Sequence, residues 1–413
     1  MNLKFLLSTA IAAVSLTATA QKDSKAYIIS GKPNNAYFWS DIKQINLATG
    51  ETQNLFETGA STFKSAGTGI KMNGSVVNSD PMAYGVAACA LDSRSNRLFF
   101  TPLHYAQLRY IDLDSKTPEF VYLDLNLINA PNGAFLSEEN HITRMAIAAD
   151  GYGYAISNDA NHLIRFSTGK NPVVTDLGNI VDADGKGISI HNKCTSWGGD
   201  MVADAFGKLY IISANHHVFT IDVSSRIATY VGAIKGLPAN YTTNGAVVST
   251  EGKVVVSSAN TFDGLYTFAI SDLNASKINI TGLKGDGNAK INGSDMANGN
   301  FLLQKEADAA AAAGRPVLVD VQQPIGNDYV SVYPNPVTGN QFTVDFKRNK
   351  PGIYNIALTD LAGRVLLNKV ANIQAEGQAE RVSLKSKPAQ GMYLIRVTNS
   401  DKEIVFSDKI FIN

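Results

Sequence analysis

Short apolar runs that end in polar turns recur along the first three quarters of the chain. One pattern alternates apolar and polar positions before a turn rich in Ser, Thr, Gly, Lys or Arg, as a half-buried strand does. Its six copies are residues 44–50, 110–116, 165–169, 220–226, 268–272 and, more weakly, 319–321. A second pattern, two apolar strands joined by an Asp-x-x-Gly-type turn, precedes most copies at residues 87–100, 145–156, 201–212, 246–256 and, faintly, 296–303.

Together the two patterns give a unit of four strands that repeats every 47 to 66 residues, roughly. Four strands and this period are typical of a β-propeller blade. They predict an all-β domain with six blades over residues 21–322. Its first unit, residues 26–56, lacks an innermost strand, which residues 316–321 could supply by closing the ring. Seven blades stay open if residues 58–83 hold a degenerate unit. A β-sandwich array or a β-solenoid is the alternative architecture.

This unit resembles the broad class of NHL-like and YVTN-like propeller repeats, although it carries no single family signature. The Ala-rich residues 305–314 favour a short helix inserted in the last blade. Residues 323–328 contain Pro, Gly, Asn and Asp, and are predicted to be a linker.

The remaining residues, 329–413, show a simpler alternation. About seven short strands separated by Asn-, Gly- and Pro-bearing turns predict an immunoglobulin-like β-sandwich. Tyr333-Pro334-Asn335-Pro336 cannot continue a strand ladder and is predicted to turn the chain where the sandwich begins. Gly363 stands where a tight turn after Asp360 needs a glycine.

The order of motifs in this tail carries a family resemblance. The motifs are Tyr333-Pro334-Asn335-Pro336, Asp360-Leu361-Ala362-Gly363-Arg364, Gly391-Met392-Tyr393 and the final Lys409-Ile410-Phe411-Ile412-Asn413. They closely resemble the C-terminal sorting domain of the type IX (Por) secretion system of certain Gram-negative bacteria. The resemblance implies translocation across the outer membrane, removal of the tail by a sortase-like protease, and release or attachment at the cell surface. The secretion machinery and that protease are the partners it implies.

The first twenty residues agree with export. One positive charge at Lys4, an apolar stretch over residues 5–14 and small residues before Gln21 predict a signal peptide cleaved between Ala20 and Gln21. Later residues contain no apolar run of membrane-spanning length. Export would place Cys89 and Cys194 in an oxidising compartment, where they could form a disulfide, or each could be a buried free thiol.

Charge excludes one class of partner. Lys plus Arg and Asp plus Glu number 36 each, so the chain is neutral and lacks the positive field that nucleic-acid binding needs. Charged residues are only 17% of the chain, and glycine and aromatic residues are abundant, which suits extracellular β-structure with many tight turns.

In a propeller, the long connections that precede the innermost strands gather at one end of the channel, where binding residues are commonly found. Here those connections are residues 58–83, 124–141, 179–199, 233–244 and 281–293. Aromatic, amide and charged side chains at this rim could hold a glycan or a peptide. The candidates are Tyr84, His141, Arg144, Trp197, Asp200, Asn244 and Asp295. The alternative is that Trp197 packs between blades while the polar groups bond to neighbouring backbone.

Signals of catalysis or of a cofactor are weaker. The six histidines form no metal-ligand spacing, and Glu138 and Glu139 near His141 favour a solvated loop over an acid/base pair. Asp182 and Asp184 precede a glycine, as in calcium loops, but the third carboxylate and the closing glutamate are missing. No cofactor is therefore expected, and a polar hairpin is the simpler interpretation of the two aspartates.

Three functions fit these observations. The first is a secreted or surface-anchored propeller that binds a glycan, peptide or protein. The second is an extracellular hydrolase or lyase with acids at the channel mouth, which would show converging carboxylates or histidines. The third is a structural component of the cell envelope, which would present a broad apolar surface. The sequence favours binding.

Overall fold

The structure, a computed structural model, describes residues 24–32, 35–66, 70–72, 75–77, 82, 85–103, 105, 107–115, 119–124, 137–170, 172–183, 187–279, 291–313, 325–326, 329–337, 339–360, 363–375, 377–386 and 388–412. The expected signal peptide and the expected closing strand at residues 316–321 lie outside these ranges. Strands make up most of the regular structure within them.

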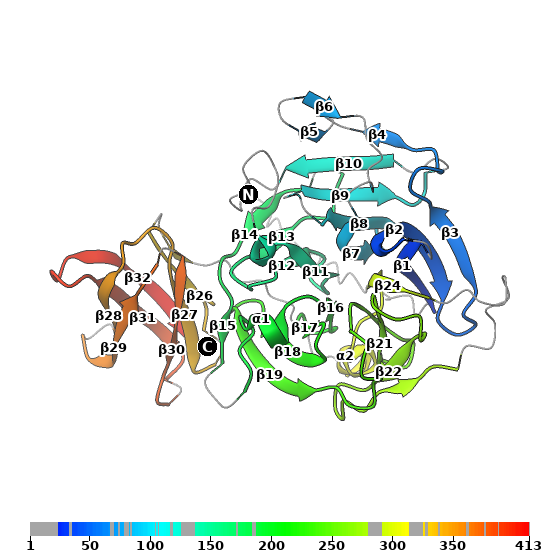
Figure 1. Cartoon of the computed structure of the whole chain (residues 1–413). Helices are drawn as coiled ribbons and strands as arrows, with labels where there is room; N and C mark the ends of the chain where they lie inside the picture. The colour runs from blue at the N-terminus through cyan, green and yellow to red at the C-terminus, as the bar shows by residue number, and fades with distance from the viewer. Residues whose placement is uncertain are drawn as a thin grey trace, which may run out of the picture.

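Five sheets surround a common axis in the described part of residues 24–302, and they confirm the predicted β-propeller (Figure 1). From the axis outward, blade 1 contains β24 (Gly293–Ala297), β1 (Lys25–Lys32), β2 (Asn35–Asn46) and β3 (Thr52–Phe56). Blade 2 contains β7 (Val86–Asp92), β8 (Arg97–Pro102), β9 (Gln107–Asp112) and β10 (Glu119–Asp124), with β4 (Lys64–Ala66) at its edge.

The other three blades follow the same order. Blade 3 contains β11 (Ile142–Ile147), β12 (Gly153–Ser157), β13 (Leu163–Phe166) and β14 (Val174–Asp176). Blade 4 contains β16 (Asp200–Ala203), β17 (Leu209–Ile212), β18 (His217–Asp222) and β19 (Ile227–Ala233), with β15 (Val181–Asp182) at its edge. Blade 5 contains β20 (Gly245–Val248), β21 (Val254–Ser257), β22 (Tyr266–Phe268) and β23 (Ser276–Lys277).

The ring of described blades closes with five sheets, where the repeat count predicts six. Neighbouring innermost strands contact one another all the way round, from β24 through β7, β11, β16 and β20 back to β24. The sixth repeat unit does not form a sheet of its own, because its strand β24 pairs antiparallel with β1. It thereby supplies the innermost strand that blade 1 lacks. A later segment of the chain therefore completes the first blade, as expected, but this segment is Gly293–Ala297 and not residues 316–321.

Burial on both faces of each sheet explains the continuous apolar runs in the innermost pairs of strands. Five apolar clusters each join two neighbouring blades, and no two blades in contact lack one among the described residues. In β21, Val254 and Val256 pack toward blade 4 while Val255 packs toward blade 1. A strand that faces apolar neighbours on both sides needs apolar residues at successive positions, as parallel sheets covered on both faces do.

Polar turns connect the two innermost strands of a blade, as the Asp-x-x-Gly pattern predicts. In blade 4, Asp204 Oδ1 accepts hydrogen bonds of 2.9 Å from the backbone N–H groups of both Phe206 and Lys208. Gly207 in this turn has a φ of +91°, a conformation that favours glycine. The carboxylate and the glycine together fix the turn.

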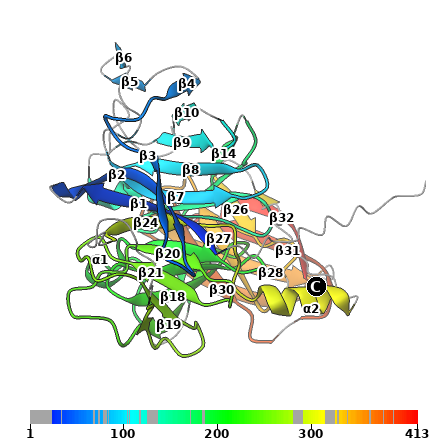
Figure 2. The same ribbon diagram turned by 90° about the vertical axis from the view of Figure 1, so that its right-hand side faces the viewer.

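Several small elements lie outside the regular blades. Beyond β10, β5 (Ile70–Met72) and β6 (Ser75–Val77) form a hairpin at the outer edge of blade 2 (Figure 2). Near the channel end, η2 (Glu138–Asn140) precedes blade 3 and α1 (Lys193–Ser196) precedes blade 4. The predicted Ala-rich helix is confirmed as α2 (Gln304–Ala312). Among the described helices, none is both long and apolar enough to cross a membrane.

The tail forms the predicted β-sandwich from two four-stranded sheets. One contains β25 (Ile325–Gly326), β26 (Val330–Tyr333), β27 (Gln341–Phe346) and β30 (Gln378–Ser383). The other contains β29 (Val365–Ile373), β28 (Gly352–Asp360), β31 (Gly391–Thr398) and β32 (Ile404–Ile412). Ile325 and Gly326 of the expected linker thus belong to the first sheet, where they pair with Val332 and Ser331.

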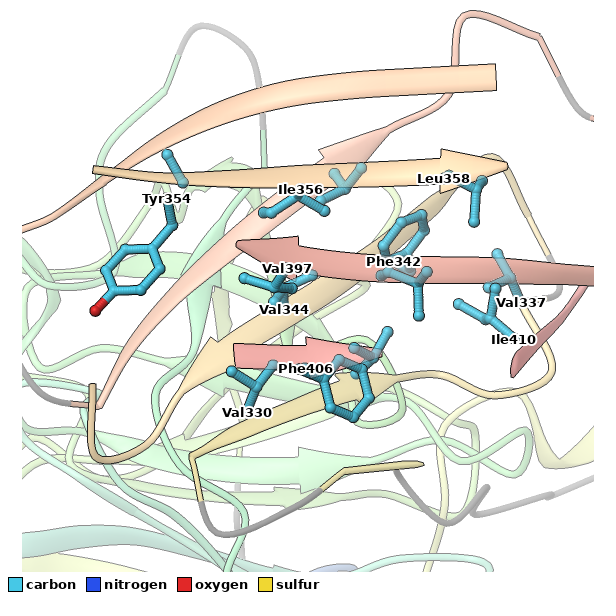
Figure 3. Packing of buried hydrophobic residues seen from close by; sticks show 14 of the residues in the cluster. Val330, Val337, Phe342, Val344, Tyr354, Ile356, Leu358, Val397, Phe406 and Ile410 are labelled. Atoms are coloured by element: carbon cyan, nitrogen blue, oxygen red, sulfur yellow. The ribbon is translucent and has the colours of Figure 1, made fainter. Parts of the chain in front are cut away.

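A single apolar core fills the space between these two sheets (Figure 3). Val344 of the first sheet and Ile356 and Val397 of the second are completely buried in it. Because only one face of each sheet is buried in this core, apolar and polar residues alternate along the strands, as in antiparallel sandwiches. The Gly363 turn also takes its predicted form, with a φ of +82° and a 3.0 Å hydrogen bond from Gly363 N–H to the Asp360 carbonyl.

Candidate functional site

The predicted rim residues separate into a buried layer and a partly exposed layer. Arg144, Asp200 and Asp295 are completely buried at the starts of the innermost strands. His141 and Trp197 are half-buried in the connections above them. Tyr84 lies outside the described residues. The two layers differ in their hydrogen bonds and therefore in what they can do.

Arg144 holds two blades together. Its Nη2 donates to the carbonyls of Ser157 at 2.6 Å and Asn158 at 2.7 Å, and its Nη1 donates to the Ser196 carbonyl of α1 at 3.3 Å. Burial lowers the pKa of Arg144 to about 10, so the guanidinium is still charged at neutral pH. Three carbonyl acceptors compensate this charge, and they tie blade 3 to the connection that leads into blade 4.

Asp200 links three blades across the channel. Its Oδ2 accepts from the backbone N–H of Ala246 in blade 5 at 2.6 Å and from that of Met296 in blade 1 at 3.3 Å. Burial raises the pKa of the Asp200 carboxyl well above its usual range, against the opposing effect of these amide donors. A ligand above the channel would find this carboxyl already occupied by backbone donors.

Asp295 makes the corresponding link from blade 1 to blade 2. Its Oδ1 accepts from Cys89 N–H at 2.8 Å. Burial, and then the negative charge of Asp200, raise the pKa of Asp295 well above its usual range. Two neighbouring buried carboxyls disfavour double ionisation, as in carboxyl pairs that share a proton. The pair therefore supports the closure of the ring at the point where β24 joins β1 and β7.

The two cysteines do not form a disulfide, and of the two thiols expected to be buried if they are free, only Cys89 is buried. Cys89 is buried in β7 at the channel, whereas Cys194 is exposed in α1. Burial raises the pKa of the Cys89 thiol well above its usual range, and the charges of Asp295 and Asp200 raise it further. The Cys89 thiol therefore stays protonated at neutral pH.

A buried hydroxyl stands at the end of the second strand of each blade, and two of the five join neighbouring blades, which was not expected from the sequence. Thr101 donates to the Ile142 carbonyl of blade 3 at 3.1 Å, and Ser257 donates to the Gly293 carbonyl of blade 1 at the same distance. The equivalent residues of the five blades are all buried; they are Ser30, Thr101, Ser157, Ser213 and Ser257. Each follows two apolar residues, a signal that the sequence does carry.

The channel below this layer is almost filled by side chains. Its cavity measures about 20 Å³ and is lined by residues of all five innermost strands, including Met145, Met201 and Met296. This volume is close to that of one water molecule. The channel itself therefore has no room for an organic ligand.

The exposed layer contains a charged and aromatic surface, the Trp197 patch, made of Glu138, His141, Lys193 and Trp197. Lys193 Nζ lies 2.9 Å from Glu138 Oε2 and 4.8 Å from the centre of the Trp197 ring. The side chains of Lys193 and Glu138 are 63% and 60% exposed, so this ion pair is open to solvent. The Trp197 indole N–H points to the His191 carbonyl at 3.4 Å. The patch joins blade 3 to blade 4 above Arg144.

The other two binding or metal candidates lie outside the patch. Asn244 belongs to the connection into blade 5, where its Oδ1 accepts from Thr242 Oγ1 at 2.5 Å and from Ala259 N–H at 3.1 Å. Asp182, the described member of the calcium candidate, accepts from Ser189 Oγ at 2.6 Å and from Ile190 N–H at 2.9 Å. Asp184 lies outside the described residues. No cluster of three or more His, Cys, Asp or Glu side chains suited to a metal occurs in the described ranges.

The sorting motifs occupy two separate parts of the sandwich. Tyr333 lies against the propeller, and Pro334 and Pro336 follow cis peptide bonds. Asn335 Oδ1 accepts from Phe411 N–H at 2.8 Å. Four further motif residues, Asp360, Arg364, Gly391 and Tyr393, line a cavity of about 650 Å³ on the far sheet, and Gly363 lies in the turn beside it. Arg364 Nε lies 2.6 Å from Asp360 Oδ2 at its edge.

Comparison with known proteins identifies the tail. Residues 331–413 match the family described as the secretion system C-terminal sorting domain, which confirms the resemblance found in the motifs. The domain indicates export by the type IX secretion system to the cell surface. No curated protein sequence matches the chain.

Solved structures similar to the chain include propellers and a sandwich. PorZ, an essential bacterial surface component of the type-IX secretion system of Porphyromonas gingivalis, is 15% identical with a TM-score of 0.32, and the alignment covers 94% of this chain and 51% of PorZ. The chain thus spans about half the length of PorZ. Virginiamycin B lyase from Staphylococcus aureus is 10% identical with a TM-score of 0.31, over 79% of this chain and 84% of that one.

The third similar structure is a DUF3244-family protein from Bacteroides vulgatus with an immunoglobulin-like β-sandwich fold. It is 15% identical with a TM-score of 0.18, over 22% of this chain and 94% of that protein. At these identities and TM-scores, none of the three similarities carries an inference about activity.

Proposed function

We propose that the propeller of this exported protein is a binding domain and that a glycan binds on the Trp197 patch. The proposal includes the rest of the export route: cleavage of the signal peptide between Ala20 and Gln21, and removal of the tail by a sortase-like protease. The ligand would meet the propeller outside the cell. The observation that carries the proposal is the half-buried Trp197 ring beside Lys193, whose ammonium group pairs with Glu138, on a connection that Arg144 holds in place.

The chemistry of the patch suits a sugar. An aromatic ring offers an apolar face to the C–H groups of a pyranose, and flanking carboxylate and ammonium groups can exchange hydrogen bonds with hydroxyls. Glu138 and Lys193 are exposed and paired with each other, and the Lys193 ammonium group lies 4.8 Å from the centre of the indole. The buried Arg144 fixes the connection that carries the ring, because it bonds to the Ser196 carbonyl immediately before Trp197. A ligand would therefore meet a preorganised surface, which limits the entropy lost on binding.

The channel mouth supports the hydrolase or lyase alternative less well. Asp200 and Asp295, the acids on which it would depend, are buried and accept hydrogen bonds from Ala246, Met296 and Cys89 backbone N–H groups. The cavity beside them holds about 20 Å³. The Trp197 patch, by contrast, is open to solvent and keeps charged groups available.

A glycan array probed with the chain from Gln21 to Asn413 tests the proposal. We expect selective binding to one class of polysaccharide, and loss of at least tenfold in affinity when Trp197→Ala removes the ring, since a stacked aromatic anchor contributes about 1.5 kcal/mol or more. Tyr152→Ala is the matched control. Tyr152 is a 39% exposed aromatic residue in the turn between β11 and β12, at the opposite end of blade 3.

The outcomes separate the hypotheses. Binding that Trp197→Ala abolishes and Tyr152→Ala preserves supports a glycan site on the patch. Equal loss in both variants would place the site elsewhere on the propeller. No binding to any glycan would contradict the proposal and direct the search to a protein partner. Binding that EDTA removes would revive calcium near Asp182.

A further inference from the structure

The sandwich rests on blade 4 through the outer face of one of its sheets. In Figure 1, β26, β27 and β30 lie on the side of the sandwich that is turned toward β15, and β15 contacts β30. Alternate residues of β27 explain the contact. Phe342, Val344 and Phe346 point into the sandwich core, whereas Thr343 and Asp345 point the other way and are nonetheless buried. A polar face that is buried outside its own core must be covered by another part of the chain.

Arg226, in the hairpin between β18 and β19 of blade 4, lies at the centre of the surface that covers this polar face of the sandwich. Its side chain is only 2% exposed. The guanidinium carbon lies 3.6 Å from the centre of the Tyr333 ring, and Nη2 lies 3.2 Å from Asp345 Oδ2. Both partners belong to the tail. The Arg226 guanidinium makes no hydrogen bond to any described group, so a ring and a carboxylate of the other domain compensate its charge.

Two further contacts fix how the domains meet. Thr343 Oγ1 donates to the Ser225 carbonyl of the same hairpin at 2.7 Å, and Thr343 is completely buried. Gly178 forms the floor of the contact, because a Cβ there would meet Arg226 Nη1 at 2.3 Å and Asp345 Oδ2 at 3.2 Å. Its φ of +92° also favours glycine. The contact thus combines shape, a hydrogen bond and a desolvated charge pair.

We propose that this docking surface, made of Gly178, Ser225 and Arg226 on the propeller and Tyr333, Thr343 and Asp345 on the tail, keeps the sorting domain bound to its propeller after the connecting chain is cut. Cutting and release are then two separate steps. Separation of the domains would expose Arg226 and Asp345 without partners, and the stacked ring and the Thr343 hydrogen bond would be lost at the same time. The inference concerns the tail and does not depend on which ligand the propeller binds.

The experiment introduces a cut between the two domains of the full chain. A recognition sequence for a specific protease, inserted between Gln322 and Gln323, divides the chain between the propeller and the sandwich. After complete cleavage, we expect the two fragments to elute together in size-exclusion chromatography at micromolar concentration. The same cleavage of the Arg226→Met variant is expected to give two separate peaks, with the dissociation constant raised on the order of 30-fold or more.

Matched variants assign the effect to the docking surface. Arg396→Met removes an exposed arginine from the far sheet of the sandwich and is expected to leave co-elution unchanged. Thr343→Val removes the hydrogen bond to Ser225 at nearly constant volume and is expected to weaken the complex less than Arg226→Met. Circular dichroism of the uncut variants shows whether each domain is folded, and Thr343→Val replaces Arg226→Met if the latter is not.

Either of two results would overturn the proposal. Separation of the wild-type fragments immediately after cleavage would show that the docking surface does not hold the tail. Co-elution of folded Arg226→Met fragments with the wild-type affinity would show that this arginine does not hold it. Failure of the glycan array would leave both results unaffected, because the docking surface does not include the Trp197 patch.

Discussion

Two arginines carry a buried positive charge, one at the propeller channel and one under the tail, and different groups compensate the two charges. Arg144 donates to three backbone carbonyls of its own domain. Arg226 makes no hydrogen bond within the described residues and relies on Tyr333 and Asp345 of the other domain. The first charge is satisfied whenever the ring is folded. The second is satisfied only while the domains are docked, so the two sites should respond differently to the same substitution.

The apolar cores of the two domains differ in a parallel way. The sandwich has one core between two sheets, whereas the propeller distributes its apolar residues over five interfaces between blades. Both tryptophans, Trp39 and Trp197, belong to the propeller. Tryptophan fluorescence therefore reports unfolding of the propeller, while far-ultraviolet circular dichroism reports both domains.

The largest effects are expected from core aromatics. Phe99 is completely buried between blades 2 and 3, with ring centres 5.3 Å from Tyr110 and 5.2 Å from Phe166. Phe99→Ala should lower the free energy of unfolding of the propeller by about 3 to 5 kcal/mol. Urea denaturation followed by tryptophan fluorescence measures this loss.

Phe342→Ala in the sandwich core provides the matched comparison. Phe342 is also completely buried, so a similar loss of about 3 to 5 kcal/mol is expected, but only in the tail. Circular dichroism should then show an early transition that tryptophan fluorescence does not follow. A shift of the fluorescence transition by the same amount would mean that the two domains unfold as one unit.

Next in size is the effect of Arg144. Arg144→Met should lower the free energy of unfolding of the propeller by about 2 to 4 kcal/mol, because three buried carbonyls lose their shared donor. Arg226→Met should change it by less, since no carbonyl of the propeller depends on that side chain. Fluorescence-detected urea midpoints of the two variants test the difference, and equal midpoints would refute it.

The channel carboxyls should make the propeller less stable at alkaline pH. Burial raises the pKa of Asp295 above that of an unfolded aspartate, so the folded chain keeps a proton that the unfolded chain releases. This contribution to stability is complete below the unfolded pKa of about 3.9 and is lost as the pH rises through the folded pKa. Asp295→Asn, which cannot ionise, should therefore flatten the decline.

Fluorescence-detected melting temperatures measured from acid to alkaline pH test this effect. Asp200 and Cys89 also face the site and stay ionisable in the Asp295→Asn variant, so a shallower slope is expected rather than a flat one. Asp114→Asn, at an exposed aspartate of the β9–β10 turn, is the control and should keep the wild-type slope. A slope unchanged by Asp295→Asn would contradict the assignment.

The smallest effect on stability is expected in the Trp197 patch. Lys193→Met removes a solvent-exposed ion pair with Glu138, a type of contact that contributes about 0 to 1 kcal/mol. The melting temperature should hardly change. Affinity for the glycan should fall, because the ammonium next to the indole is lost. Thermal unfolding and the array, performed on the same preparation, separate the two effects.

The sequence predicted the strands and both folds because each follows from a local pattern. Runs such as residues 254–256 and the alternation along residues 342–346 depend only on which faces of a strand are buried. The described residues form five sheets around the axis, one fewer than the repeat count. A repeat count treats residues 296–303 as a unit, whereas strand pairing, a contact distant in sequence, assigns β24 to blade 1.

The sequence predicted where the candidate residues stand in the blades but not whether their side chains are exposed. Arg144, Asp200 and Asp295 do stand where the innermost strands begin, yet whether a side chain points to solvent or to a neighbouring amide depends on the packing of blades. Lys193 and Arg226 were not selected, because an isolated basic residue in a short helix or a turn carries no pattern. Lys193 contacts Glu138, which belongs to an earlier connection, and Trp197. The two partners of Arg226, Tyr333 and Asp345, lie in the other domain.

Native-state amide hydrogen exchange of the wild-type chain and Arg226→Met, compared by mass spectrometry, tests the central difference most directly. Faster exchange is expected only in β25, β26, β27, β30 and the β18–β19 hairpin, because these elements form the docking surface. The amides of Cys89, Ala246 and Met296, which bond to the channel carboxyls, should keep their wild-type protection. Loss of protection at those three amides would contradict the claim that the ring is satisfied within its own domain, since the ring would then depend on the tail.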